Sequence, residues 1–194
     1  MPVTYTNRKG KTYFLCKGQT KTGKTRYYFA REPKGEPLED IPDGYKINES
    51  VNGIISLAKD RPVLVQEDEI AVVETEVSRN PKSRRYRVSV KHDRIEIYEM
   101  IAPEAETMAG ILDKYGFSPI NAVAKMQDYL DGSSQFSAIM RFILVDKDER
   151  EFRGQRWCYS GSIDDWIDVD YGQIQDLASQ MIHALGTDEF FELF

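Results

Sequence analysis

Residues 18–25 read GQTKTGKT, which matches the phosphate-binding pattern G-x-x-x-x-G-K-[ST] at every position. A functional loop of this kind needs a helix that begins at the lysine, because the helix N-terminus faces the bound phosphates. The residues after Lys24 are TRYYFAREP, with three consecutive aromatics and an early proline. This composition predicts a β-strand, so the glycine-rich stretch is interpreted as the turn of a hairpin.

The alternative interpretation is a nucleotide hydrolase, in which three residues would have specific roles. Lys24 would contact the β- and γ-phosphates, and Thr25 would hold Mg²⁺. Asp146 follows the apolar run FILV and would complete the metal shell. A helix after Lys24 would support this alternative, and a hairpin would remove its structural basis.

The rest of the chain predicts an α+β fold: a small N-terminal antiparallel β module, residues 1–60, followed by a mixed α+β domain, residues 61–194, built from hairpins and three or four helices. Within the module, an Asn52-Gly53 pair predicts a tight hairpin, because both residues tolerate positive φ. In the second part, helices are expected from Asp68, near Pro103, from Ser118-Pro119 to Asp131-Gly132, and over residues 172–185. RRYRVSVKHDRIEIYEM predicts a second hairpin, and FSAIMRFILV and EFRGQRWCYSG predict strands.

Charge is distributed unevenly along the chain. Residues 1–35 hold nine basic residues and one acidic residue, whereas the whole chain has a net charge of −6. Such an imbalance suggests a polyanionic partner, or neutralisation of one part of the chain by the other.

Because the basic turns are joined by strands with aromatic residues that can stack on bases, we expect a basic β-ribbon that contacts nucleic acid. The expected phosphate contacts are Lys11, Lys17, Lys21, Lys24 and Arg26, and the expected stacking residues are Tyr13, Tyr27 and Phe29. A second basic cluster in residues 79–87 is a candidate extension of that surface.

The sequence gives little indication of a metal site or of catalysis. Asp164, Asp165, Asp168 and Asp170 lie in one short window, but their spacing does not match a calcium-binding loop. The interpretation favoured here is that Asp164 or Asp165 caps a turn while Trp166 and Ile167 pack inward. We therefore expect no metal, no cofactor and no catalytic residue. The C-terminal tail, FFELF, either docks on the protein or is exposed as a docking element for a protein partner.

The N-terminal residues MPVTYTNRKGKTYF lack the apolar run of a signal peptide, and no apolar run approaches the length of a membrane span. These features predict a cytoplasmic protein that has no membrane partner. The two cysteines, Cys16 and Cys158, are expected to be reduced and buried.

Two stretches resemble a group of uncharacterised bacterial proteins: YTNRKGKTYFL, TKTGKTRYYF and IPDGYKI near the N-terminus, and RFILVDKDEREFRGQRWCYSGSIDDWI near the C-terminus. Together they cover about half of the chain. No activity is established for that group, so the resemblance implies no catalytic residues. The N-terminal strands are also similar, in size, charge and aromatic content, to the three-stranded DNA-binding arm of phage-type integrases, in which a small sheet enters the major groove.

Overall fold

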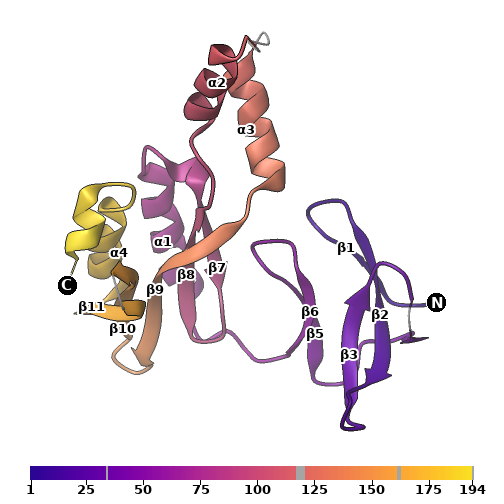
Figure 1. Ribbon diagram of the computed structural model, residues 1–194. Coiled ribbons are helices and arrows are strands. Elements are labelled where there is room, and N and C mark those ends of the chain that lie inside the picture. Colours follow the sequence, from indigo (N-terminus) through magenta and orange to yellow (C-terminus); the bar gives the residue numbers. More distant parts are fainter. Residues whose placement is uncertain (34, 117–120, 161–162, 194) are drawn as a thin grey trace. The chain divides into compact units, whose positions relative to one another are not determined.

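A computed structural model describes residues 1–33, 35–116, 121–160 and 163–193. The chain divides into two compact units, Met1–Arg61 and Pro62–Phe194, which we call unit 1 and unit 2. The α+β class expected from the sequence is confirmed, because an antiparallel β unit is followed by a unit that combines helices with an antiparallel sheet (Figure 1).

Unit 1 is built from short antiparallel strands. β1 (Thr4–Thr6), β2 (Thr12–Gln19) and β3 (Thr25–Ala30) lie in that order, and the two-residue β4 (Glu36–Pro37) also pairs with β2. β5 (Tyr45–Glu49) and β6 (Ile55–Lys59) form a separate hairpin. Its turn contains the Asn52-Gly53 pair, with Gly53 at φ +75°, so the hairpin predicted from that pair is confirmed.

The glycine-rich stretch is the turn of a β-hairpin. β2 and β3 pair in antiparallel register, with Gln19 opposite Thr25, and the Thr20 N–H donates to the Lys24 carbonyl at 2.8 Å. Gly23 adopts φ +77°, a conformation that favours glycine. Strand β3 therefore stands where a phosphate-binding loop requires a helix, and the nucleotide-hydrolase alternative loses its structural basis.

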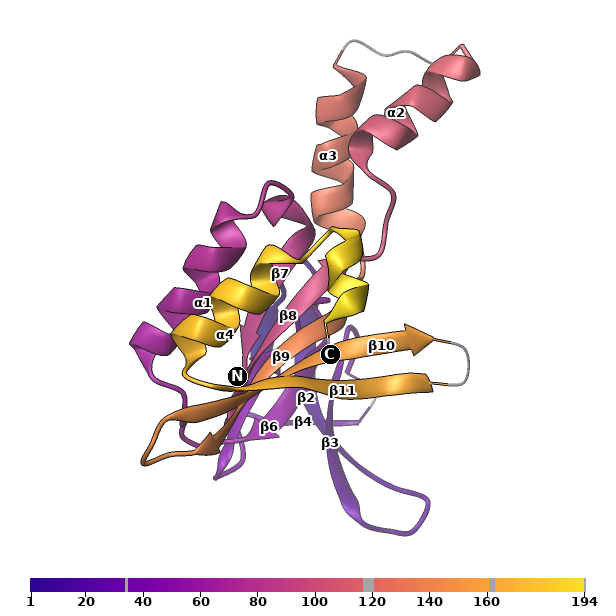
Figure 2. The ribbon, with the colours of Figure 1, turned by 90° about the vertical axis from the view of Figure 1, so that its left-hand side faces the viewer.

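Unit 2 is a five-stranded antiparallel sheet in the order β11-β10-β9-β8-β7. Its strands are β7 (Tyr86–Val90), β8 (Arg94–Met100), β9 (Phe136–Asp146), β10 (Glu151–Ser160) and β11 (Ile163–Gly172). α1 (Glu67–Arg79) and α4 (Ile174–His183) lie side by side over one face of the sheet (Figure 2). α2 (Ala105–Lys114) and α3 (Ala122–Ser133) form a helical pair between β8 and β9.

Alternation along the strands explains why the helices cover that face. Ile95 and Ile97 on β8 are fully buried and lie opposite Phe142 and Met140 on β9. α4 completes this core with Leu177, which is also buried. Because side chains two residues apart on a strand share a face, these positions form one continuous apolar surface for the helices.

Three local expectations are corrected. Residues 163–172, expected to contain a capped turn, form strand β11, so the neighbours Trp166 and Ile167 point to opposite faces and cannot both pack inward. Helix α1 begins at Glu67 with Gln66 as its N-cap, two residues before the expected cap at Asp68, and its capping box includes Glu69. Helix α3 continues through Gly132 to Ser133. The expected helix start at Ser118-Pro119 lies outside the described residues.

The C-terminal segment docks on unit 2. A 3₁₀ turn, Asp188–Glu192, places Phe190 in the core at 8% exposure. The guanidinium of Arg156, itself 2% exposed, donates from Nε to the Leu193 carbonyl at 2.7 Å and from Nη2 to the Phe191 carbonyl at 3.0 Å. The tail therefore supplies both apolar contact and hydrogen-bond acceptors to a buried cation.

Within the described residues, no helix combines the length and the apolar character needed to cross a membrane. The longest helix among them, α1, has 13 residues and an acidic first turn.

Deleting residues 190–194 should destabilise unit 2. The deletion removes the Phe190 side chain from the core and two acceptors from the buried Arg156, which together should cost at least about 3 kcal/mol of unfolding free energy. Phe191→Ala is the matched control, because Phe191 is 62% exposed and its truncation should change stability by less than about 0.5 kcal/mol. Urea unfolding followed by the fluorescence of Trp157 and Trp166 measures both, and a deletion as stable as the intact chain would contradict the docking.

Candidate nucleic-acid interface

The eight residues expected to contact nucleic acid all lie in the first three strands of unit 1 or in the turns between them. Lys11 lies in the turn between β1 and β2, and Tyr13 and Lys17 lie on β2. Lys21 and Lys24 lie in the turn between β2 and β3, and β3 carries Arg26, Tyr27 and Phe29. Because β2 has eight residues at about 3.3 Å each, Lys11 and the turn lysines are separated by about 25 Å along the strand.

The strand register separates these residues into two faces. Lys17 is directly opposite Tyr27, and Leu15 is opposite Phe29, so Tyr13, Lys17, Tyr27 and Phe29 share one face. Arg26 is opposite Gly18 on the other face, where its guanidinium lies 5.1 Å from the centre of the Tyr28 ring. The structure therefore brings seven of the eight expected residues to one face or its two ends, and places Arg26 apart from them.

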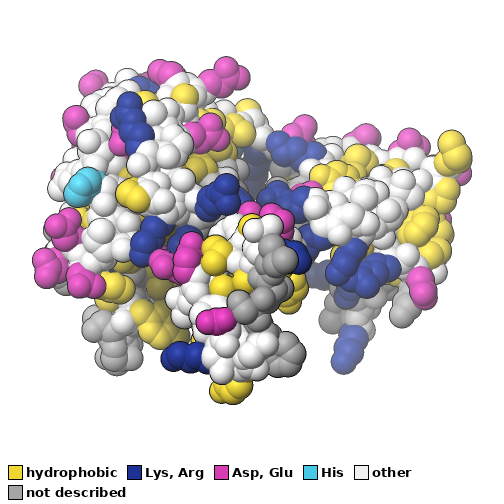
Figure 3. Space-filling model, turned by 90° about the horizontal axis from the view of Figure 1, so that it is seen from above, with side chains coloured by type: hydrophobic (Ala, Val, Ile, Leu, Met, Phe, Trp, Pro, Cys, Tyr) yellow, Lys and Arg dark blue, Asp and Glu magenta, His cyan; other side chains and the backbone are white. Residues whose placement is uncertain are grey.

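The lysines of this face form no ion pair among the described residues, although Lys17 lies opposite Glu36 of β4 in the strand register. The ion pairs there include Arg8 with Glu49 and Lys46 with Asp60 in unit 1, but none of Lys9, Lys11, Lys17, Lys21 and Lys24. Residues 1–61 contain twelve Lys and Arg against seven Asp and Glu. Acids within unit 1 are therefore too few to neutralise its cations, and Lys and Arg side chains are visible on the surface (Figure 3).

The second basic cluster, residues 79–87, differs because three of its cations form ion pairs. Arg79 pairs with Glu76 at 2.6 Å, Lys82 with Glu104 at 2.9 Å, and Arg85 with Glu99 at 3.8 Å. The positive charges of residues 79–87 are thus largely matched by acids within unit 2. We do not include them in the candidate interface.

A hollow of about 300 Å³ lies at the Lys11 end of the face. We call it the turn pocket, and it is lined by Asn7, Lys9, Lys11, Tyr13, Phe29, Asn52, Gly53, Ile54 and Ile55. Three expected residues, Lys11, Tyr13 and Phe29, meet in it. Sequence reasoning missed Asn7, Lys9 and Asn52, because the pocket forms only where the turn between β5 and β6 meets the turn between β1 and β2.

Asn7 joins these two turns. Its side-chain Oδ1 accepts from the backbone N–H groups of Lys9 at 3.1 Å and Lys11 at 2.9 Å, and its Nδ2 donates to the Gly53 carbonyl at 2.7 Å. The residue is only 5% exposed, so these hydrogen bonds form away from water. Asparagine suits this place because its side chain can bond to the backbone two residues ahead and still offer a donor.

Arg8 is basic but is committed to the fold. The Glu49 carboxylate accepts from the Arg8 backbone N–H at 2.9 Å, from its Nε at 2.8 Å, and from the Tyr5 hydroxyl at 3.1 Å. Burial by itself raises the pKa of Glu49, but these hydrogen bonds outweigh burial and leave the pKa below its usual value. The charge of Arg8 is therefore used inside unit 1.

The aromatic residues differ in how much of each ring is accessible. Tyr27 is 36% exposed and packs edge-on against Tyr45 with ring centres 6.1 Å apart. Tyr13 and Phe29 are half-buried, and both line the turn pocket. The aromatics thus serve the packing of unit 1 and still present surface at the pocket.

The acidic window in unit 2 does not converge on a cation site. Within the described part of the chain, no group of three or more His, Cys, Asp or Glu side chains is placed to hold a metal ion. Asp164 and Asp165 are consecutive on β11 and so point to opposite faces. The Asp168 carboxylate accepts from the Gln155 side chain and from the Tyr171 hydroxyl. Cys16 and Cys158 are both free thiols and buried.

Replacing Asn7 with alanine should loosen unit 1. Three hydrogen bonds are lost, and the buried Gly53 carbonyl and two part-buried N–H groups lose their partner, which should cost about 2–3 kcal/mol. Asn7→Asp is the graded control, because its oxygens still accept from Lys9 and Lys11 while the link to Gly53 is lost. NMR-detected hydrogen exchange at the amides of β2 reports on unit 1 specifically, and unchanged protection in Asn7→Ala would show that Asn7 does not hold the turns.

Comparison with known proteins does not connect this arrangement with a known family. No family model matches the chain, and neither a curated protein nor a solved structure matches it. The case for a function therefore depends on the geometry and charge of the residues themselves.

Proposed function

We propose that unit 1 binds nucleic acid without catalysis, through contacts between its unpaired lysines and phosphate groups. One observation carries the proposal: the lysines of β2 and its two turns form no ion pair among the described residues, and they lie on or at the ends of a face that carries Tyr27 and Phe29. Unpaired cations in a row neutralise phosphates and release condensed counterions, which is the main source of affinity for nucleic acid.

Packing within unit 1 does not explain why lysines cluster in the turn between β2 and β3. Lys21 and Lys24 lie in one short turn and are both exposed, so their like charges repel each other and add nothing to the core. In the same unit, Lys46 is paired with Asp60 at 3.2 Å and Arg8 with Glu49 at 2.8 Å. A polyanionic partner would explain why neighbouring lysines of β2 and its turns are left without ion pairs.

The strand register limits the proposed contact face to some of the expected residues. The distance from Lys11 to the turn lysines, about 25 Å, corresponds to roughly seven nucleotide steps at 3.4 Å each. Lys17 lies between these ends, beside Tyr27. Arg26 is left out of the contact face, because it points to the opposite side and packs against Tyr28.

The double variant Lys21→Gln and Lys24→Gln should weaken binding in a salt-dependent way. If both lysines contact phosphates, the slope of log Kobs against log salt should become shallower by about 1.4 to 1.8, since each lost contact contributes about 0.7 on single strands and 0.9 on duplexes. Fluorescence anisotropy of labelled oligonucleotides, titrated at several salt concentrations, measures the slope.

The matched control is Lys46→Gln with Lys59→Gln. It removes the same charge from unit 1, but from exposed positions on the β5–β6 hairpin. The control should leave the slope within about 0.3 of the original value. Equal effects of the two double variants would mean that net charge, and not contact by the turn lysines, controls binding.

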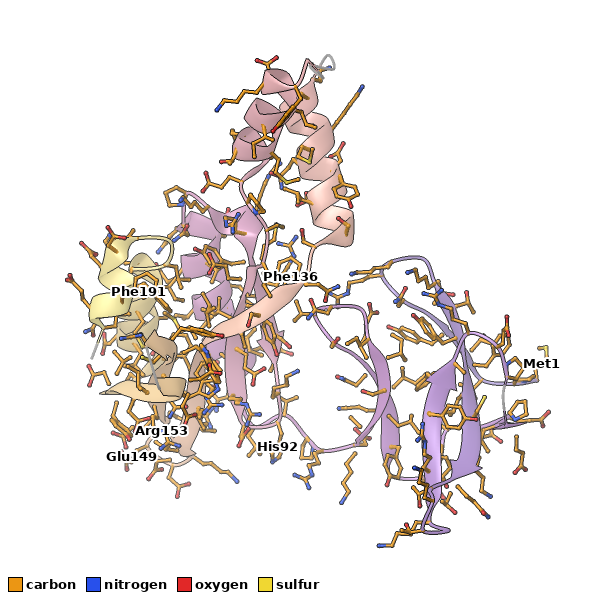
Figure 4. The ribbon with its side chains drawn as sticks, viewed as in Figure 1. Met1, His92, Phe136, Glu149, Arg153 and Phe191 are labelled. Carbon is orange, nitrogen blue, oxygen red and sulfur yellow. The ribbon has the colours of Figure 1, made fainter. Side chains whose placement is uncertain are left out.

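A second candidate function is a protein interaction at the C-terminal segment. Phe191, labelled in Figure 4, is 62% exposed, and it lines a hollow of about 560 Å³ together with Trp157 and Tyr159. Exposed aromatics beside a hollow are typical of residues that anchor a protein partner.

Phe191→Ala should then lose a partner in pull-down experiments while the fold is retained. Ile111→Ala is the matched control, because Ile111 is an exposed apolar residue on α2, at 50% exposure. A partner that both variants retain equally would argue against this role for Phe191.

A further inference from the structure

We propose that the turn pocket receives one unstacked nucleobase together with its neighbouring phosphate, so that unit 1 prefers single-stranded to double-stranded nucleic acid. This inference rests on the proposed function, which it makes more specific. It follows from the size of the pocket, the chemistry of its walls and the way its two turns are fixed.

The size of the pocket fits one ring system. Its volume of about 300 Å³ is at the lower end for small-molecule sites, which suits a single base and not a stacked pair. Tyr13 on β2 and Phe29 on β3 are diagonal neighbours on the same face of the sheet, so their rings line the pocket from adjacent strands. Every base has a π-face, and stacking on such rings is a common source of affinity for single strands.

The charge of the pocket fits a phosphate beside the base. Lys9 and Lys11 are the charged residues among those that line it, and no acidic side chain lines it. Neither lysine has an ion-pair partner among the described residues. A cationic hollow with aromatic walls matches the chemistry of a nucleotide, an anion attached to a flat ring.

The pocket is fixed in advance by the backbone of the two turns. Asn7 holds the N–H groups of Lys9 and Lys11 on one side and the Gly53 carbonyl on the other. Gly53 has φ +75°, and a Cβ there would lie 3.3 Å from Asn7 Nδ2. The turns therefore need no large rearrangement on binding, which reduces the entropy lost when a ligand is held.

A duplex cannot offer such a ligand without distortion. Its bases are paired and stacked inside the helix, whereas a single strand can turn one base outward at little cost. The lysines at the far end of β2 can still contact the phosphates of either form. The pocket is thus the part of unit 1 that distinguishes a single strand from a duplex.

The test uses the full chain and three labelled probes: a ten-nucleotide oligothymidylate, the same strand paired with oligoadenylate, and a ten-unit abasic strand that has the phosphates without the bases. The wild-type protein should bind oligothymidylate about tenfold more tightly than the abasic strand, in line with the contribution of one stacked base. It should also bind oligothymidylate more tightly than the duplex.

Phe29→Leu removes the aromatic face but keeps an apolar side chain, and it should abolish the preference for oligothymidylate over the abasic strand. Phe14→Leu is the matched control, because Phe14 points to the opposite face of β2, and it should keep the preference. Lys11→Gln should weaken binding of both strands equally and leave their ratio unchanged, because it removes a phosphate contact only. Hydrogen exchange at the amides of β2 confirms that each variant is folded.

Equal affinity of the wild-type protein for oligothymidylate and the abasic strand would overturn the base site while leaving phosphate binding intact. A preference for the duplex, or an unchanged preference in folded Phe29→Leu, would overturn it as well. No binding of any probe at low salt would instead refute the proposed function. A free mononucleotide that binds as tightly as the oligonucleotide would show that the pocket takes a small molecule and not a strand.

Discussion

The hydrogen bonds of the Asn7 carboxamide hold together the part of the molecule on which its proposed function depends. A single buried side chain accepts from the backbone of one turn and donates to the backbone of another, 46 residues later in the sequence. The turn between β1 and β2 is tied to the β5–β6 hairpin by Asn7 and also by Arg8, which donates to the Val51 carbonyl at 3.3 Å and to the Glu49 carboxylate. Asn7 is the residue that holds the backbone N–H groups of Lys9 and Lys11, both of which line the turn pocket.

The two units use charge in different ways. In unit 2, several charged groups close to the core satisfy one another: Arg150 donates from Nε to Glu69 at 2.8 Å, and Arg94 donates to Glu96, which also accepts from the Tyr98 hydroxyl. In unit 1, the lysines of β2 and its turns have no such partners among the described residues. Charge that is paired mainly supports a fold, whereas charge that is left unpaired on a surface is available to a ligand.

Local chemistry was enough to predict much of the fold. The aromatic run after Lys24 and the Asn52-Gly53 pair determine their hairpins through residues adjacent in sequence. β11 was missed because its aspartates have low strand propensity, and it exists through pairing with β10. The sequence left open whether the C-terminal tail docks or is exposed, because nothing near Phe190 indicates that the distant Arg156 donates to the tail carbonyls.

For the candidate site, strand alternation could have separated Arg26 from the other cations. The contact between two distant turns at Asn7 has no signal in the sequence.

The most direct test of the account is an NMR titration of the isotope-labelled full chain with oligothymidylate, followed at the backbone amides. Binding through unit 1 predicts saturable shifts at Lys9, Lys11 and Phe29, at the turn pocket, and at Lys21 and Lys24, at the other end of β2. It also predicts that the core amides of β8 and β9 in unit 2 remain unchanged. Shifts confined to Pro62–Phe194, or no shifts at low salt, would contradict the claim that the unpaired lysines of unit 1 bind nucleic acid.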